Sequence, residues 1–323
     1  MGVVAVTSPL PGDGLRRLAG EHLVRMHPTG SPISGAELAA FAAGADALVT
    51  LLADRVDARV FAACPGLRIV ANVAVGYNNI DAEAARAAGV WVTNTPDVLT
   101  EATADLTWAL ILAVTRRVVE GDRVLRSGGF TGWRPDFMLG AGLQERVLGI
   151  VGMGRIGRAV ARRAAGFGVR VRYHDQAPVA AEHASGATFV ADLDELLAGA
   201  DIVTLHTPAT PGTRHLLDAR RLHRLPRGAF VVNTSRGEVV DEAALVAALE
   251  DGHLGGAGLD VYEREPAIHP GLLGRSDVVL LPHLGSATLT ARVAMADVAI
   301  ENVLAVLAGR TPPTPVVTPP ARR

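Results

Sequence analysis

Three polar side chains in the second half of the chain are of types that could act together on a carbonyl group. Arg236 and His283 each follow an apolar run, and Glu265 lies between them in the sequence. A guanidinium pairs with a carboxylate through two hydrogen bonds. A carboxylate beside an imidazole orients the ring and favours its proton-donating form. Taken singly, they would be a surface arginine, a loop glutamate and a capping histidine, so the interpretation depends on their joint placement.

A glycine motif precedes these residues and predicts the ligand on which they act. The apolar run 147–151 leads into Gly152, Gly154 and Gly157, and a helical pattern and a second apolar run, 169–173, follow. The first glycine permits a tight turn, the second lets the backbone approach a pyrophosphate, and the third lets the helix pack on the strand. The helix N-terminus then offers free N–H groups to phosphates. We therefore predict dinucleotide binding.

Asp175 ends the second of these runs and bears on the choice of cofactor. Its carboxylate suits a ribose diol and would repel a 2′-phosphate, and residues 176–178 supply no arginine to hold one. NAD(H) is therefore favoured, and NADP(H) is the alternative because His174 could offset part of the repulsion. In the plainer interpretation, Asp175 only caps a loop.

The elements that must position these residues alternate along the whole chain. Apolar runs predict strands, and amphipathic stretches between them predict helices. The expected strands are 3–6, 47–52, 68–73, 91–93, 147–151, 169–173, 201–206, 229–234, 258–261 and 278–281. The expected helices are 12–20, 35–43, 54–63, 81–88, 100–126 with Thr100 as N-cap, 156–166, 193–199, 218–224, 241–251 and 288–309. The proline-rich tail, 311–315, is expected to be irregular.

Composition narrows the class of protein. The 323 residues suggest about two domains, and a net charge of −2 gives no electrostatic case for a nucleic-acid or membrane partner. All 31 basic side chains are arginine, which removes the lysine amine that Schiff-base and Walker-type chemistry need. The single cysteine, Cys64, suits a reducing compartment, and the N-terminus reads as a strand, so we expect a cytoplasmic protein. No metal site is expected.

Four motifs in order give the chain a family resemblance. After the glycine motif come NTSRGEVVDE at 233–242, GAGLDVYEREP at 256–266 and PHLGSAT at 282–288. Together they resemble the D-isomer-specific 2-hydroxyacid dehydrogenases over nearly the whole length. The segments 94–112 and 133–140 are most similar to the glyoxylate/hydroxypyruvate reductase group.

The resemblance implies a fold: two doubly wound, parallel-sheet (Rossmann-like) α/β domains with a cleft between them, the cofactor domain being inserted into the other. Residues 1–96 and 287–323 would form a flavodoxin-like substrate domain, and residues 97–286 the NAD-binding domain. The family's proteins are similar in being dimers joined through the nucleotide domains, so a homodimer is expected.

It also implies roles for matching residues. Arg236 would bind the substrate, His283 would donate the proton and Glu265 would be its partner. The backbone of Val75 and Gly76 would hold the substrate carboxylate, Leu52 would line the pocket, and Trp133 would reach the active site of the partner subunit or be a buried interface aromatic. The expected cofactor contacts are Gly152, Gly154, Arg155, Ile156, Gly157, Asp175, Thr207, Thr234, Ser235, Asp260 and Gly285.

These expectations amount to NADH-dependent, reversible reduction of glyoxylate or hydroxypyruvate to the D-2-hydroxyacid. A dehydrogenase for D-3-phosphoglycerate or another D-2-hydroxyacid is the enzymatic alternative, and an NAD(H)-sensing, corepressor-like protein is the alternative of another class. Phosphite oxidation would need a lysine, and formate oxidation a glutamine in place of Glu265. His206, which ends the run 201–206, is the rival proton donor.

Overall fold

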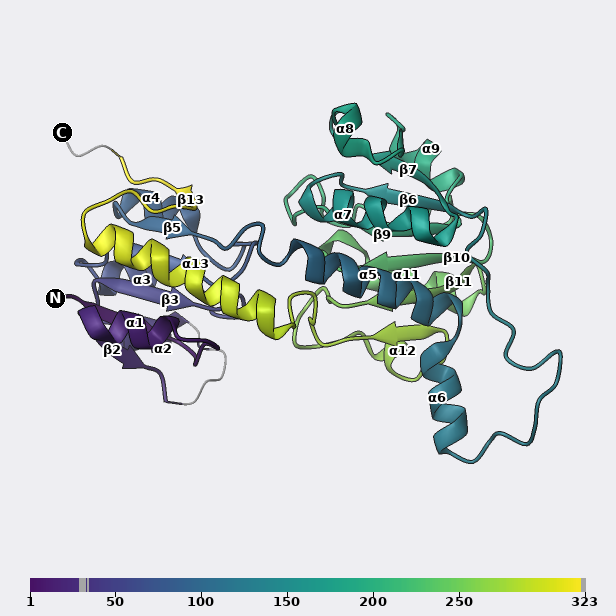
Figure 1. The fold of residues 1–323 in the computed structure, drawn as a ribbon, viewed down its shortest axis with the longest axis horizontal. Helices are drawn as coiled ribbons and strands as arrows, with labels where there is room; N and C mark the ends of the chain where they lie inside the picture. Colours follow the sequence, from purple (N-terminus) through teal and green to yellow (C-terminus); the bar gives the residue numbers. More distant parts are fainter. Residues whose placement is uncertain (29–32, 34, 321–323) are drawn as a thin grey trace. The chain divides into compact units, whose positions relative to one another are not determined.

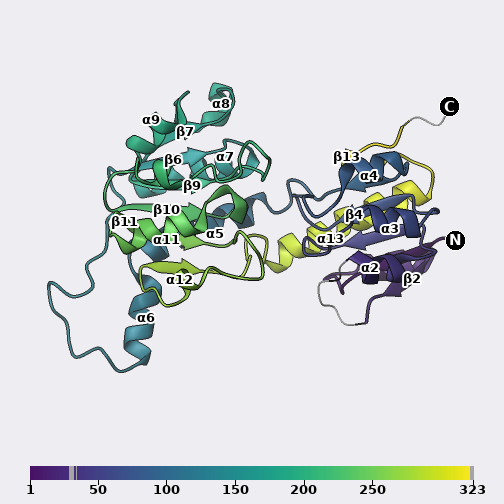
Figure 2. The same cartoon turned by 180° about the vertical axis from the view of Figure 1, so that it is seen from behind.

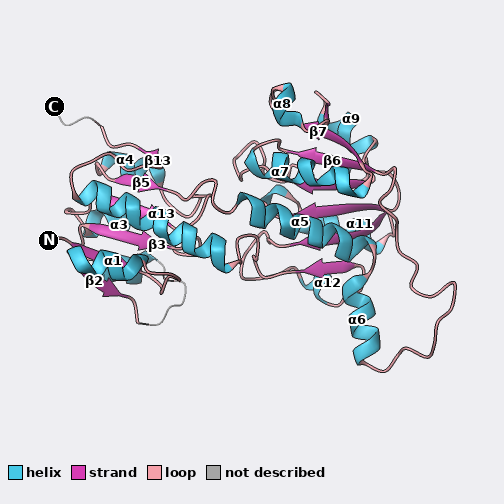
Figure 3. Ribbon diagram, viewed as in Figure 1, coloured by secondary structure: helices cyan, strands magenta, loops and turns pink. Residues whose placement is uncertain are grey.

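The computed structural model describes residues 1–28, 33 and 35–320, which fold into two compact α/β units (Figure 1). Unit 1 consists of Met1–Leu99 and Ala287–Arg323, and unit 2 consists of Thr100–Ser286. Each unit contains a sheet of predominantly parallel strands with helices on both faces (Figure 3). The predicted fold class, two Rossmann-like doubly wound units, is confirmed.

Unit 1 is built from both ends of the chain around a six-stranded sheet. Its strands are β1 (Val3–Val6), β2 (Leu23–Met26), β3 (Ala47–Thr50), β4 (Ile69–Asn72), β5 (Trp91–Thr93) and β13 (Pro315–Val317). Its helices are α1 (Gly14–Glu21), α2 (Gly35–Ala42), α3 (Ala58–Ala63), α4 (Ala82–Ala87) and α13 (Leu289–Leu307). The strand order β2-β1-β3-β4-β5-β13 is the flavodoxin-like order extended by one strand.

The terminal segment of unit 1 corrects one prediction. The tail is not irregular, because β13 pairs antiparallel with β5 at the edge of the sheet and buries Val317. Pro315 is tolerated there because an edge strand needs hydrogen bonds on one side only. The strand β2 was also missed, since its side chains are half-buried or exposed and lack an apolar run. The helix expected at 54–63 begins only at Ala58, where Asp57 caps it.

Unit 2 contains a seven-stranded parallel sheet in the order β12-β11-β10-β9-β6-β7-β8. Its strands are β6 (Val147–Val151), β7 (Arg170–His174), β8 (Thr188–Phe189), β9 (Ile202–Leu205), β10 (Ala229–Asn233), β11 (Leu254–Leu259) and β12 (Val278–Leu280). Its α-helices are α5 (Thr100–Thr115), α6 (Val118–Arg126), α7 (Arg155–Ala164), α8 (Ala181–Ala184), α9 (Leu193–Ala198), α10 (Ala219–Leu222), α11 (Glu242–Glu250) and α12 (Pro270–Leu273). The order reverses between β6 and β9, and ligands of such sheets bind at the carboxyl ends of the strands beside this point.

The long helix expected at 100–126 is two helices. Thr100 is the first residue of α5 rather than its cap, and α5 ends at Thr115. Arg117 then takes a left-handed conformation, with φ 54°, before α6 begins. A non-glycine residue in that region cannot continue a right-handed helix, so the pattern of apolar residues concealed a break. The short elements β8, α8 and α12 and the first half of β11 were also missed.

Apolar residues of unit 2 form two clusters on opposite faces of its sheet. Leu148 and Ile150 of β6 pack with residues of α5 and α7, which cover the face seen in Figure 1. Val203 and Leu205 of β9 pack with α9 and α11 on the other face, seen in Figure 2. Because successive strand residues point to opposite faces, a strand covered on both sides must be apolar throughout. This explains the continuous apolar runs in the sequence.

Candidate active site

The glycine turn joins β6 to α7 at the switch point of the unit 2 sheet. Gly152 has φ +94°, and a Cβ there would lie 2.7 Å from the carbonyl oxygen of His206. A Cβ at Gly157 would collide with the carbonyl of Gly152, so the helix packs directly on the turn. At Gly154, by contrast, a Cβ would meet no neighbouring atom within 4 Å among the described residues. Gly152 and Gly157 therefore shape the turn, and Gly154 leaves the outer side of the turn open.

Residues Arg155 and Ile156 begin α7 directly after this turn. Arg155 is exposed and Ile156 is half-buried. The first N–H groups of a helix have no intrahelical acceptor, and they carry the positive end of its dipole. The turn and the start of α7 together present donors suited to a phosphate group.

Asp175 lies directly after β7 and is already tied to the glycine turn. Its Oδ2 accepts a hydrogen bond from the N–H of Met153 at 2.7 Å, and its Oδ1 accepts one from Gln176 at 2.7 Å. A carboxylate has about four acceptor sites, so two stay available for a ribose diol. Asp175 therefore does cap a loop, and this role leaves it able to contact a ligand.

Two buried polar atoms beside the turn have no partner among the described residues, Nδ1 of His206 and Oγ1 of Thr207. The other ring nitrogen of His206 lies 3.1 Å from Oγ1 of Thr204. Burial lowers the pKa of His206 to about 3, so its ring is neutral near pH 7. A neutral imidazole in this position is poorly suited to donate a proton, which argues against His206 as the rival to His283.

Arg236 is presented by a turn that Asn233 holds. The Asn233 Oδ1 accepts hydrogen bonds from both the backbone N–H and the hydroxyl of Ser235, and its Nδ2 donates to the carbonyl of Arg236 at 2.8 Å. Burial lowers the pKa of Arg236 below its ordinary value, against the opposing charges of Glu238 and Glu265. The guanidinium still remains charged in a protein at neutral pH. It is therefore a fixed, partly desolvated cation.

The turn that carries Arg236 packs against the backbone of the loop that carries Glu265. A Cβ at Gly237 would overlap the carbonyl group of Tyr262. On the other side of the loop, the Tyr262 hydroxyl donates to the carbonyl of Leu281 at 2.8 Å. Only glycine permits the first contact, and the second joins the loop to the segment that leads into His283. Three separate chain segments are thereby brought to one edge of the sheet.

Glu265 and His283 form a hydrogen-bonded pair, with Oε2 of Glu265 2.9 Å from Nδ1 of His283. Oε1 of Glu265 accepts from the N–H of Tyr262 at 3.0 Å. Burial acts to raise the pKa of Glu265, but His283, the Tyr262 N–H and the charge of Arg236 outweigh it and leave this pKa below its ordinary value. Glu265 is therefore ionised and accepts the Nδ1 proton, which leaves Nε2 of His283 as the nitrogen that can exchange a proton.

Asp260 fixes the backbone on which His283 stands. Its carboxylate accepts hydrogen bonds from the N–H groups of Leu284 (2.6 Å) and Gly285 (2.8 Å), and its carbonyl accepts from the N–H of His283. His283 has φ 56°, a left-handed conformation that a non-glycine residue adopts only when its surroundings hold it there. Burial raises the pKa of Asp260, and the two N–H groups act against that rise. This carboxylate is engaged in structure before any ligand is considered.

Helix α5 supports the same edge from behind. Thr107 exchanges a hydrogen bond with Thr234 at 2.9 Å between hydroxyl oxygens, and Thr103 donates to the carbonyl of Gly285 at 3.1 Å. Both threonines are buried. Thr234 and Gly285 thus have structural partners as well as the cofactor role predicted for them.

The remaining predicted residues lie outside the segments that carry Arg236, Glu265 and His283. Leu52 and the pair Val75–Gly76 lie in unit 1, on the loops that follow β3 and β4. Trp133 is 83% exposed and lies in the segment between α6 and β6, which projects from unit 2 (Figure 1). Phe130 and Leu139 of the same segment are also exposed. The substrate-binding roles of Leu52, Val75, Gly76 and Trp133 stay predictions.

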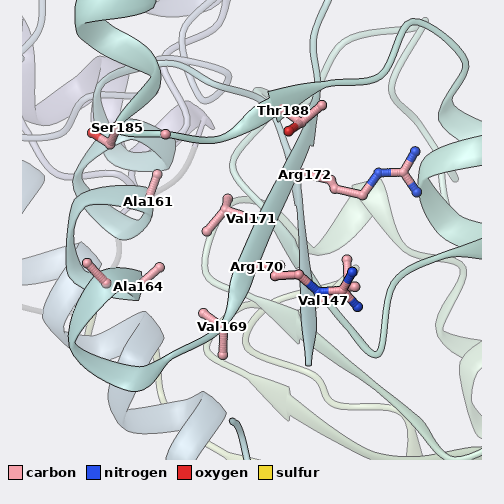
Figure 4. Close-up of a pocket in the computed structure, with 11 residues that line it drawn as sticks. Val147, Ala161, Ala164, Val169, Arg170, Val171, Arg172, Ser185 and Thr188 are labelled. Atoms are coloured by element: carbon pink, nitrogen blue, oxygen red, sulfur yellow. The ribbon is translucent and has the colours of Figure 1, made fainter. Parts of the chain in front are cut away.

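A cavity of about 430 Å³ in unit 2 is not the candidate site. Val169 and Val171 point toward Ala161 and Ala164 of α7, whereas Arg170 and Arg172 point to the other side of β7 (Figure 4). The cavity lies along β7 and reaches Val147 at the start of β6, whereas the glycine turn follows the end of β6. It is therefore separate from the candidate residues.

Several residues that organise the site were not singled out in the sequence. Asn233, Tyr262, Thr103 and Thr107 act through contacts between distant segments. Asn233 and Tyr262 do lie inside the motifs at 233–242 and 256–266, and their place in these motifs is the feature by which the sequence could have indicated them. Among the described residues there is no group of three or more His, Cys, Asp or Glu side chains placed to hold a metal ion. Within the same residues, no helix is both long and apolar enough to span a membrane.

Comparison with known proteins identifies the class. Residues 108–285 match the NAD-binding domain of the D-isomer specific 2-hydroxyacid dehydrogenases. The chain therefore belongs to that family, as the motifs indicated, and it is an oxidoreductase of that class with a nicotinamide-binding domain.

Its relatives include glyoxylate reductases. The chain is 46% identical to the glyoxylate reductase of Thermococcus onnurineus over 96% of this chain and 94% of the relative. It is 47% identical to that of Korarchaeum cryptofilum over 96% and 94%. Among solved structures, the TT0316 protein of Thermus thermophilus is 50% identical with a TM-score of 0.92 and covers 98% of this chain and 100% of that one. An NADPH-dependent glyoxylate/hydroxypyruvate reductase from Sinorhizobium meliloti is 33% identical with a TM-score of 0.87, and the coverage is 100% of both chains.

Proposed function

We propose that the protein reduces a small 2-oxoacid, glyoxylate or hydroxypyruvate, to the D-2-hydroxyacid with NADH, and that the reaction is reversible. The observation that carries the proposal is the His283–Glu265 hydrogen bond beside the half-buried cation Arg236. These groups supply a proton donor, its orienting carboxylate and an anchor for an anion. The names of the relatives, glyoxylate reductases, support this choice of substrate.

The residues at the switch point fit a nicotinamide dinucleotide. The open side of Gly154 leaves room for a pyrophosphate, and Asp175 retains acceptor sites for a ribose. The unpartnered atoms of His206 and Thr207 are buried polar groups that a ligand would satisfy. Unpaired buried polar groups are costly, so their presence together beside the glycine turn supports a bound partner.

Three side chains then share the work of reducing the oxoacid carbonyl. When bound, the reduced cofactor supplies a hydride for the C2 atom of the oxoacid. Arg236 binds the substrate carboxylate and polarises the carbonyl oxygen, where negative charge develops. Nε2 of His283 gives its proton to that oxygen, and Glu265 stabilises the charged imidazole before transfer. In the oxidation direction, the neutral imidazole accepts the proton back.

NADH is proposed over NADPH because the carboxylate of Asp175 would meet the extra phosphate. The Sinorhizobium meliloti relative is named as NADPH-dependent, so the two cofactors must be compared directly.

We further propose that the protein is a homodimer. The exposed apolar residues Phe130, Trp133 and Leu139 of the segment that projects from unit 2 would be covered by the partner subunit.

A panel of 2-oxoacids assayed with both cofactors tests the function. We expect turnover of glyoxylate or hydroxypyruvate with NADH, with lower kcat/KM for bulkier oxoacids and for 3-phosphohydroxypyruvate. His283→Ala and Arg236→Ala should each lower kcat/KM by about 10³-fold or more. Binding of NADH without turnover of any oxoacid would favour the sensor alternative instead, and near-normal activity of either variant would refute the assigned roles.

A further inference from the structure

Three consecutive peptide carbonyls in unit 1 are held by groups from the protein, in the loop that follows β4. The carbonyl of Ala74 accepts from the backbone N–H of Thr95 at 2.9 Å. The carbonyl of Val75 accepts from Nδ2 of Asn94 at 2.8 Å, and that of Gly76 accepts from Nδ2 of Asn72 at 2.9 Å. Each of these peptide groups is therefore fixed in orientation by its oxygen.

The opposite edges of the same peptide groups are the N–H groups of Val75, Gly76 and Tyr77. In a trans peptide the N–H points away from its own carbonyl, and the cis bond found among the described residues is elsewhere. No protein acceptor for these three N–H groups is present in the described part of the chain. Successive backbone N–H groups in a turn conformation can form an anion-binding concavity, and residues 73–75 lie in a bend of the chain.

The amide of Asn72 is itself held in one orientation. Asn72 is fully buried, and its Oδ1 accepts from the hydroxyl of Thr50 at 3.1 Å and from Nδ2 of Asn79 at 3.3 Å. An amide whose oxygen receives two donors cannot flip without losing both hydrogen bonds. Its nitrogen is therefore committed to the carbonyl of Gly76.

The same network reaches the loop that carries Leu52. Nδ2 of Asn79 also donates to the carbonyls of Leu51 (3.1 Å) and Asp54 (2.9 Å). The buried carboxylate of Asp54 in turn accepts from the N–H of Leu51 at 2.7 Å. The loops after β3 and β4 are thus joined through side-chain amides and one carboxylate, and neither is free to move alone.

We propose that Asn72 is a positioning residue for substrate recognition. By holding the carbonyl of Gly76, it presents the N–H group of Tyr77 to the carboxylate of a 2-oxoacid, beside the N–H group of Gly76, whose peptide group Asn94 holds. Asn79 and Thr50 fix the amide that does this. The inference rests on the proposed function for the identity of the anion, but the orientation of the peptide groups is independent of it.

The first test uses the isosteric variant Asn72→Asp, which replaces the donor facing Gly76 with an acceptor. Loss of a buried hydrogen bond of this kind corresponds to an increase of about 10-fold or more in the KM for glyoxylate. The kcat should change less than about threefold and the KM for NADH should not change. Asp46→Asn is the matched control, because Asp46 accepts from the N–H of Val3 at the opposite end of the same sheet. That swap should leave both KM values unchanged.

Thr50→Val tests the same network more gently if Asn72→Asp fails to fold. It removes the hydroxyl that orients the Asn72 amide and should raise the KM for glyoxylate in the same direction by a smaller factor. In a folded variant, a lowered melting temperature with an unchanged KM would show a merely structural role and overturn the proposal.

The second test does not require turnover. Backbone amide resonances of Val75, Gly76 and Tyr77 are followed by NMR in the ¹⁵N-labelled full chain during titration with oxamate, a 2-oxoacid isostere. We expect the Gly76 and Tyr77 resonances to shift in the wild type and in Asp46→Asn, and the Tyr77 resonance to shift less in Asn72→Asp. If oxamate leaves these resonances unmoved in the wild type, the inference is wrong, even if the enzyme reduces 2-oxoacids. If they shift but no oxoacid is reduced, the proposed function fails and the anion site stands.

Discussion

His283 and Glu265 are joined by a hydrogen bond of 2.9 Å between Nδ1 and a carboxylate oxygen, although eighteen residues separate them in sequence. The left-handed backbone of His283 is held by Asp260, and the loop of Glu265 is held by Tyr262. The pair is therefore built by its surroundings, and substitutions can separate the contribution of each part.

Replacing Glu265 with glutamine removes the negative charge and keeps the shape. The glutamine no longer gives Nδ1 of His283 an ionised acceptor, so proton transfer from the ring to the substrate should be slower. The value of kcat at the optimum should fall by about 10- to 100-fold. Steady-state assays with glyoxylate and NADH measure this effect, and an unchanged kcat would show that Glu265 does not act through His283.

The lowered pKa of Glu265 also predicts a dependence of stability on pH. A carboxyl whose folded pKa lies below its unfolded value stabilises the fold above the unfolded value, and this contribution is lost as the pH falls through the folded pKa. Urea unfolding between pH 6 and pH 3 should therefore show a smaller acid loss in Glu265→Gln than in the wild type. Equal losses would place the acid sensitivity elsewhere.

The burial of the neutral His206 ring also predicts that stability falls as the pH is lowered. Here the group that takes up a proton on unfolding is an imidazole and not a carboxylate. Its folded pKa of about 3 lies far below the ordinary value, so the unfolded chain takes up the proton first and stability falls as the pH drops below about 6.5. His206→Gln should remove this component and flatten the curve between pH 6.5 and pH 4. Its kcat for glyoxylate should retain the wild-type pH dependence, and a changed dependence would reinstate His206 as a proton donor.

Arg236→Lys keeps a positive charge but loses the planar pair of donors. The chain uses arginine for every basic side chain, so no nearby lysine offers compensation. We expect kcat/KM for the 2-oxoacid to fall by about 10²-fold, with the KM for NADH unchanged, because one ammonium cannot bind a carboxylate bidentately. Steady-state kinetics with both substrates varied would measure this, and a loss in NADH affinity alone would reassign the residue to the cofactor.

Gly237→Ala places a methyl group inside the backbone of Tyr262, which no rotamer change can relieve. We expect the free energy of unfolding to fall by about 2–4 kcal/mol or more, with loss of activity in the protein that remains folded. Gly166→Ala is the control, since a Cβ there meets no neighbouring atom among the described residues. Thermal unfolding should show a large drop for the first variant and little change or a small gain for the second. Equal melting temperatures would contradict the close packing.

The sequence predicts the local parts of this protein better than the contacts between them. The glycine turn, the apolar strands and the positions of Arg236 and His283 depend on residue types and short spacings. The antiparallel strand at Pro315 was missed, because a proline-rich tail does not show that it can pair with the edge of a sheet. The break at Arg117 was missed, because the apolar pattern continues through it. Asn72 and Tyr262 became visible only through hydrogen bonds to segments that are distant in the sequence.

Unit 1 takes five of its six strands from the first hundred residues, but β13 and the helix α13, which lies on β3 and β4, come from the end of the chain. A ribosome adding about 5–20 residues per second needs roughly ten to forty seconds to synthesise the intervening unit. During that interval, β3 and β4 lack the cover that α13 later gives them. Vectorial synthesis therefore completes unit 2 before the last helix of unit 1 emerges.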